Sequence, residues 1–96
     1  MKGMIDGPVV IDRDEAIRGM VAGSIIVRSG GALSLHGMVN GDVTIELGGR
    51  AIIHGMVNGA VVNQGGHVEV HGMVDAVRDA PGARTMIAGG ALVRQR

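Results

Sequence analysis

The hexapeptide His-Gly-Met-Val-Asn-Gly occupies residues 36–41 and returns unchanged at residues 54–59. Related copies begin at Lys2, Arg18 and His71, so successive copies start 16, 18, 18 and 17 residues apart. A second marker keeps step with the first, because paired glycines recur at 30–31, 48–49 and 65–66. Two markers in register indicate an internal repeat of one structural unit.

The length of this repeat predicts a β-helix. A unit of at most 18 residues is too short for a two-helix repeat. Residues between the markers alternate and are rich in β-branched types, as in Val43-Thr44-Ile45, which indicates short strands separated by glycine corners. Each repeat then makes one coil, and the coils stack as parallel strands about 4.8 Å apart. We expect an all-β fold, a right-handed parallel β-helix (solenoid) of about five rungs, with 16–18 residues per rung and a triangular cross-section.

The period alone leaves the hand of the coil open. A coil of 18 residues also suits the left-handed β-helix, in which an aliphatic residue occupies every sixth position. Stepping by six from Val39 meets aliphatic residues as far as Val57 but then reaches Asn63. The shorter repeats break that register too, so the right-handed form is favoured and the left-handed form stays as the alternative.

The chain is expected to form one domain over residues 1–96, with regular repeats at 2–76. Residues 77–96 are expected to form an irregular C-terminal cap or an assembly strand. Pro81 and the charged residues around it interrupt the motif there.

The interior is expected to be aliphatic and narrow. Hydrophobic residues make up 46% of the chain, yet Phe, Tyr and Trp are absent, although aromatic side chains usually dominate a core of this size. Alternation predicts inward columns that stack like on like: Val21, Val39, Val57 and Val74; Ile25, Val43 and Val61; Leu35, Ile53 and Val70. Asn63 falls in the column of Val27 and Ile45, where we expect either a buried polar residue bonded to corner backbone or a local bulge.

Composition excludes several classes of function. Nine acidic and nine basic residues give zero net charge, and with no aromatic side chains the chain lacks the features of a nucleic-acid binder. Cysteine is absent, which removes disulfides and thiolate metal sites. No apolar run reaches the length of a membrane span, so we expect a cytoplasmic protein without a transmembrane segment, and peripheral association with a membrane stays open.

Methionine marks one corner of the repeat. Five of the seven methionines hold the same motif position, and alternation places them outward as an adaptable apolar stripe suited to protein contacts. The alternative is a corner turned differently, with methionine filling the interior. The predicted protein-interaction face consists of Met4, Met20, Met38, Met56, Met73, His36, His54, His71, Asn40 and Asn58.

The three histidines of this face raise the question of a zinc site. A His₃ site is found on the β-helix of the γ-class carbonic anhydrases, but that class is left-handed, longer and gathers its ligands across a trimer interface. The repeat itself accounts for a histidine at each equivalent position, so we expect an outward basic ladder, with no metal and no cofactor. The serines and threonines lie in no nucleophile-elbow sequence, and we therefore expect no catalytic residues and no enzymatic activity.

The pattern Gly-x-Val-x-Gly-x-(Val/Ile), as in residues 37–43 and 55–61, recurs every 17 to 18 residues. Over residues 2 to about 76 it resembles the bactofilins, polymer-forming proteins of the bacterial cytoskeleton. The resemblance implies a right-handed, three-faced β-helix that polymerises end to end without nucleotide, often near the inner membrane.

Two functions are then weighed. The first is a non-enzymatic, bactofilin-like scaffold that self-associates, as a homo-oligomer, through the β-helix ends or the Met-rich face. The alternative is a compact protein-binding module, such as an immunity or antitoxin protein that neutralises a bacterial toxin through one face of the β-helix.

Overall fold

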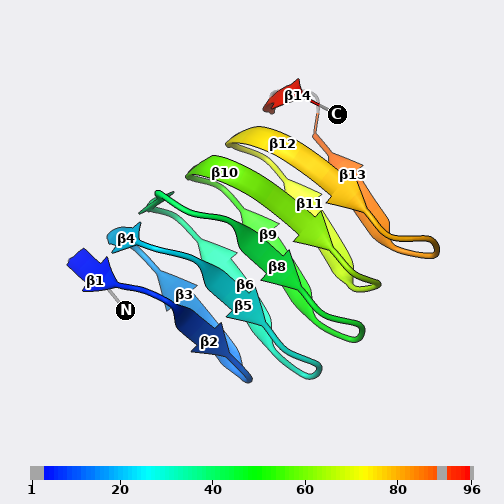
Figure 1. Cartoon of the computed structure of the whole chain (residues 1–96), viewed down its shortest axis with the longest axis horizontal. Coiled ribbons are helices and arrows are strands. Elements are labelled where there is room, and N and C mark those ends of the chain that lie inside the picture. The colour runs from blue at the N-terminus through cyan, green and yellow to red at the C-terminus, as the bar shows by residue number, and fades with distance from the viewer. Residues whose placement is uncertain (1–3, 89–90, 96) are drawn as a thin grey trace.

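Successive repeats stack as the coils of a parallel β-solenoid in the computed structural model, which describes residues 4–88 and 91–95. All strand pairings among these residues are parallel, and none of them lies in a helix. The solenoid has about five turns (Figure 1), as the repeat predicts.

Each coil carries three strand segments. The first coil contains β1 (Met4–Asp6), β2 (Val9–Ile11) and β3 (Asp14–Ile17). The second contains β4 (Met20–Ala22), β5 (Ile25–Val27) and β6 (Ala32–Leu35), and the third contains β7 (Met38–Val39), β8 (Val43–Ile45) and β9 (Arg50–Ile53). In the next two coils the first two segments join into one strand, giving β10 (Met56–Asn63) with β11 (His67–Val70), and β12 (Met73–Asp79) with β13 (Arg84–Ile87). A last strand, β14 (Leu92–Gln95), begins a sixth coil.

Three faces result from this stacking. The first face holds β1, β4, β7, the starts of β10 and β12, and β14, while the second holds β2, β5, β8 and the ends of β10 and β12. The third face is the five-stranded sheet β3-β6-β9-β11-β13. In Figure 1 the chain runs along the second face in front, returns along the third face behind, and advances towards the C-terminus. This path is a right-handed coil.

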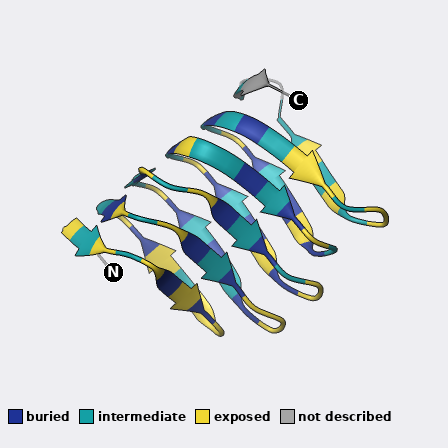
Figure 2. Ribbon diagram, viewed as in Figure 1, coloured by how far each residue is buried: buried dark blue, intermediate teal, exposed yellow. Residues whose placement is uncertain are grey.

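The core consists of the predicted aliphatic columns. Every residue of the three predicted columns is buried, with at most 1% of its surface exposed. Figure 2 shows the buried positions recurring at matching places on successive strands, which is the alternation that the sequence predicts. Because neighbouring coils supply the contacts, each coil buries its apolar side chains against the coil above and below it.

The paired glycines make the corner between the second and third faces. Gly30 and Gly48, each the first of its pair, both have φ of 85°, a conformation that suits a residue without Cβ. The second glycine is buried, and a Cβ on Gly31 would lie 2.5 Å from the carbonyl oxygen of Ile11 in the coil below. One glycine therefore turns the chain, and the next allows the coils to approach.

The same turn recurs beyond the last copy of the motif. In residues 80–83, Pro81 precedes Gly82, whose φ is 84°, and the amide of Ala83 donates a 3.0 Å hydrogen bond to the carbonyl of Ala80. Proline followed by a glycine of positive φ is the pattern of a type II turn. The turn delivers β13 into register with β11, so regular pairing reaches Ile87 and resumes in β14.

Asn63 is fully buried, with 0% exposure. Its Oδ1 accepts hydrogen bonds from the amides of Gly65 (3.2 Å) and Gly66 (2.8 Å). Its Nδ2 donates to the carbonyl of Arg84 (2.9 Å) and to Oγ1 of Thr85 (3.0 Å) in the next coil. The expectation of a buried polar residue bonded to corner backbone is confirmed.

Candidate functional site

The first face begins at a corner that only glycine fits. A Cβ on Gly37, Gly55 or Gly72 would lie between 1.7 and 2.0 Å from the carbonyl oxygen of the glycine in the coil below. Any other residue would push neighbouring coils apart. A histidine precedes each of these glycines and a methionine follows it. Because the coils approach so closely at the glycine, these two side chains occupy equivalent positions in successive coils.

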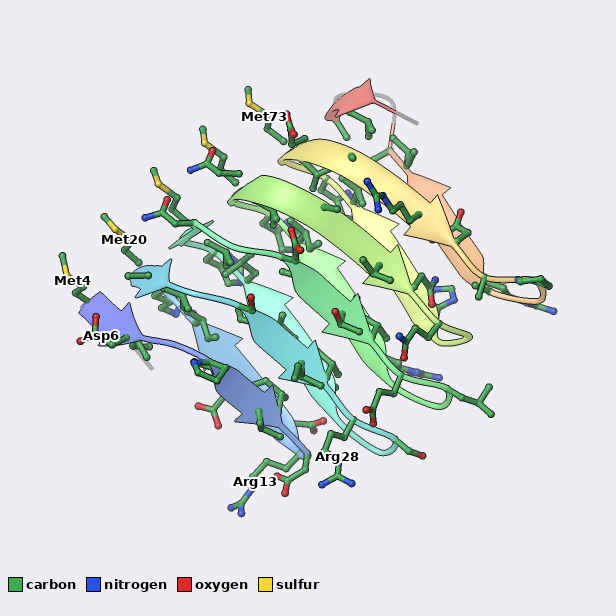
Figure 3. The ribbon with its side chains drawn as sticks, in the orientation of Figure 1. Met4, Asp6, Arg13, Met20, Arg28 and Met73 are labelled. Carbon is green, nitrogen blue, oxygen red and sulfur yellow. The ribbon has the colours of Figure 1, made fainter. Side chains whose placement is uncertain are left out.

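The methionines form one column on the outside of this face. The register aligns them directly from coil to coil: Met4 with Met20, Met20 with Met38, Met38 with Met56, and Met56 with Met73. Met4 is 73% exposed and the other four are half-buried, whereas the valine after each of those four is buried. Figure 3 shows Met4, Met20 and Met73 projecting from the same edge of the molecule. The column therefore faces outward, and the interior alternative is wrong.

The histidines form a second column beside the methionines. The ring centroids of His36 and His54 lie 4.9 Å apart, and those of His54 and His71 lie 5.0 Å apart, with interplanar angles of 8° and 14°. Zn²⁺ needs nitrogens that converge at about 2.0–2.1 Å, whereas parallel stacked rings lie side by side. Among the described residues no group of three His, Cys, Asp or Glu is placed to hold a metal ion.

One carboxylate joins the end of the histidine column to the third face. Glu69 Oε1 lies 3.2 Å from Nε2 of His71, and its Oε2 lies 3.6 Å from Nε2 of His67. The hydrogen bond from His71 is the main reason that the pKa of Glu69 lies below its ordinary value of 4.5, with His67 adding to the effect and partial burial opposing it.

An asparagine column completes the face. Nδ2 of Asn58 donates a 2.9 Å hydrogen bond to Oδ1 of Asn40, and Nδ2 of Asn40 lies 3.6 Å from the sulfur of Met20. Side-chain hydrogen bonds of this kind link neighbouring coils on the surface, in addition to the backbone hydrogen bonds between their strands. The ten residues predicted for the interaction face thus lie together, in three adjacent columns that we call the ladder face.

A groove that was not predicted from the sequence lies at the corner between the second and third faces. Arg50, His67 and Arg84 are aligned in register on β9, β11 and β13. They line a groove of about 310 Å³ whose other walls are glycines: Gly48, Gly49, Gly65, Gly66 and Gly82. The sequence contains one signal for this groove, because a basic residue follows each of two glycine pairs, at Arg50 and His67.

No family model, curated protein or solved structure matches this chain. Within residues 4–88 and 91–95, no helix is long and apolar enough to cross a membrane.

Proposed function

We propose that this chain is a non-enzymatic, bactofilin-like structural protein of the cytoplasm, and that a second copy of the chain stacks on the ends of its solenoid. The proposal rests on the partial exposure of core residues at the ends of the solenoid. The partly buried residues packed against the core belong to the terminal coils: Ile5 at one end, and Val77, Ile87, Ala91 and Val93 at the other. Coils between them bury their aliphatic columns almost completely.

The terminal strands also leave one edge unpaired. Among the described residues β1, β2 and β3 pair only with the second coil, and β13 pairs only with β11. An unpaired edge presents amide and carbonyl groups that can bind a further strand. A second copy placed in line would supply strands of the same direction and spacing.

The columns at the two ends suit a head-to-tail contact. Ile17 begins the inward column of the third face and Ile87 ends it, so β3 of a second copy would continue this column and cover Ile87, although Ile17 itself is already fully buried in its own chain. One column of outward residues runs from Asp14, through Arg50, to Arg84. The same stacking places the carboxylate of Asp14 next to the guanidinium of Arg84, and both residues are exposed.

The ladder face is the weaker candidate for self-association. Its methionines are flanked by the exposed histidine and asparagine columns rather than by further apolar residues, and its asparagines already bond to one another. Buried apolar area is the main driving force for association of protein surfaces. The coil ends, which continue an aliphatic core, offer that area more directly.

Light scattering and analytical ultracentrifugation across a concentration series test the proposal. We expect oligomers or filaments that dissociate on dilution, and Ile87→Glu is expected to abolish them because it places a charge on the end of the core. Met86→Glu is the matched control: Met86 is the adjacent residue, is 48% exposed, and points away from the core. A wild-type protein that stays monomeric at every concentration would overturn the proposal.

The compact protein-binding module is the second candidate, and β14 favours it. This strand pairs with the start of β12 and so covers part of one end of the solenoid. A monomeric wild-type protein that binds a toxin through one face would support this candidate in place of self-association.

A further inference from the structure

We propose that the methionine column of the ladder face binds soft monovalent metal cations, Cu⁺ or Ag⁺, between the sulfur atoms of neighbouring coils. The column comprises Met4, Met20, Met38, Met56 and Met73. All five belong to one chain, so binding does not require the end stacking proposed above.

Methionine is constant at an outward position of the motif, whereas the other outward side chains of the motif vary. Of the six motif positions, only the corner glycine and the methionine are the same in all five copies. The close approach of the coils accounts for the glycine. No comparable steric reason exists for methionine, because it lies outside the core, and a surface that needed only apolar bulk would accept leucine or isoleucine. The adjacent inward position shows such exchange, with Ile5 in the first coil and valine in the others.

The spacing of the methionines suits a bridging cation. Directly aligned residues on neighbouring parallel strands are about 4.8 Å apart. The Zn²⁺–thiolate bond is about 2.3 Å long, and with a bond of that order a cation held between two sulfurs in a near-linear arrangement spans about 4.6 Å. The methionine side chain is unbranched and adapts its torsions readily, which allows neighbouring thioethers to converge. Each adjacent pair in the column is therefore a potential two-sulfur site.

The sulfur of Met20 is engaged by a residue of the next coil. The sulfur of Met20 accepts the 3.6 Å hydrogen bond from Nδ2 of Asn40 in the coil above. This contact shows that the sulfur of Met20 acts as an acceptor towards a residue of the next coil, on the exposed side of the face. The cation would replace the amide as the partner of that sulfur.

The composition of the face selects among cations. Thioethers are soft ligands and favour Cu⁺ over hard cations such as Mg²⁺ and Ca²⁺, which prefer oxygen. His36 and His54 each precede a ladder methionine by two residues, on the same outward side, and imidazole is a further ligand suited to copper. The stacked histidines alone do not converge, so the site depends on sulfur.

The test uses the full chain with ¹³C-labelled methionine methyl groups, titrated with silver nitrate in chloride-free buffer. We expect the methyl resonances of Met38 and Met56 to shift on addition of Ag⁺. Met86, which lies on the third face and is 48% exposed, is the internal control and is expected to stay in place. Competition with a chromogenic Cu⁺ chelator under reducing conditions then measures the affinity for Cu⁺.

The double variant Met20→Leu/Met56→Leu keeps the size of both side chains and removes one sulfur from every adjacent pair of the column. Met86→Leu is its matched control. Circular dichroism checks that both fold. We expect the double variant to lose affinity for Ag⁺ by at least about tenfold, or about 1.4 kcal/mol, and the control to bind like the wild type. Ladder methyl groups that do not shift, a Met86 shift in step with them, or unchanged affinity of the double variant would overturn the proposal. Displacement of Ag⁺ by Zn²⁺ would overturn it as well, because that result assigns the binding to histidine.

Discussion

The side-chain oxygen of Asn63 accepts a 2.8 Å hydrogen bond from the amide of Gly66, and in doing so it replaces a backbone carbonyl. In the longer corner of the third coil, the equivalent amide of Gly49 donates to the carbonyl of Glu46 at 2.9 Å. The fourth coil has one residue fewer at this corner. A buried polar side chain thus compensates for a deletion in the repeat.

Replacing Asn63 by leucine is expected to destabilise the fold. The substitution leaves the buried amide of Gly66 without its acceptor, and an unsatisfied buried group costs about 1–3 kcal/mol. Urea unfolding followed by circular dichroism measures the loss. Asn58→Leu is the control, because Asn58 makes an exposed hydrogen bond to Asn40 and its loss is expected to cost about 0.5 kcal/mol or less. Equal losses in the two variants would contradict this account of the corner.

Two glycines are expected to differ in their tolerance of alanine. A Cβ on Gly55 would lie 1.9 Å from the carbonyl oxygen of Gly37, whereas a Cβ on Gly82 would meet nothing within 4 Å. Gly55→Ala must separate two coils, and we expect a loss of about 3 kcal/mol or more. Gly82→Ala strains only a backbone with φ of 84°, at a cost of about 1–2 kcal/mol. Thermal unfolding of both variants gives the comparison, and a more damaging Gly82→Ala would refute it.

The salt bridge of Glu69 gives a prediction for pH. Because the pKa of this carboxyl is depressed in the folded protein, its contribution to stability is present above the pKa of the unfolded chain and is lost as pH falls through the folded value. The variant Glu69→Gln should therefore have a lower Tm than the wild type near pH 5, and the difference should shrink as the pH is lowered below 4.5. In a protein that already carries His71→Gln, the further change Glu69→Gln should lower the Tm much less, since the hydrogen bond from His71 is the largest cause of the pKa shift. A Tm difference that grows on acidification would contradict the assignment.

The aliphatic columns and the outward methionines could be predicted because alternation along a strand assigns each residue to a face. Those positions follow from sequence spacing alone. The turn at Pro81 and Gly82 was harder to recognise, since it lacks the paired glycines of other corners although it has the same requirement for positive φ. The groove lined by Arg50 and Arg84 depends on the register of three coils. That register follows only when the corner after Asn63 is known to be one residue shorter than the corner of the coil below.

β14 pairs with the start of β12, at the place where a second copy would stack on this end of the solenoid. Leu92 pairs with Met73 on the first face, in the column where Met4 pairs with Met20 at the other end. In a head-to-tail stack, β1 of a second copy would take the place on β12 that β14 occupies. Val93, which packs partly buried against the core, helps to hold β14 there.

The variant Val93→Asp introduces a charge at that contact and is expected to release β14. If β14 competes with a second copy, the concentration at which oligomers form should fall by about tenfold, which corresponds to about 1.4 kcal/mol. Analytical ultracentrifugation measures the midpoint, and Thr44→Asp, on the outer side of the second face in a middle coil, is the control. A higher midpoint in Val93→Asp would show instead that β14 contributes to the contact between copies, because release of the strand would then remove part of the interface.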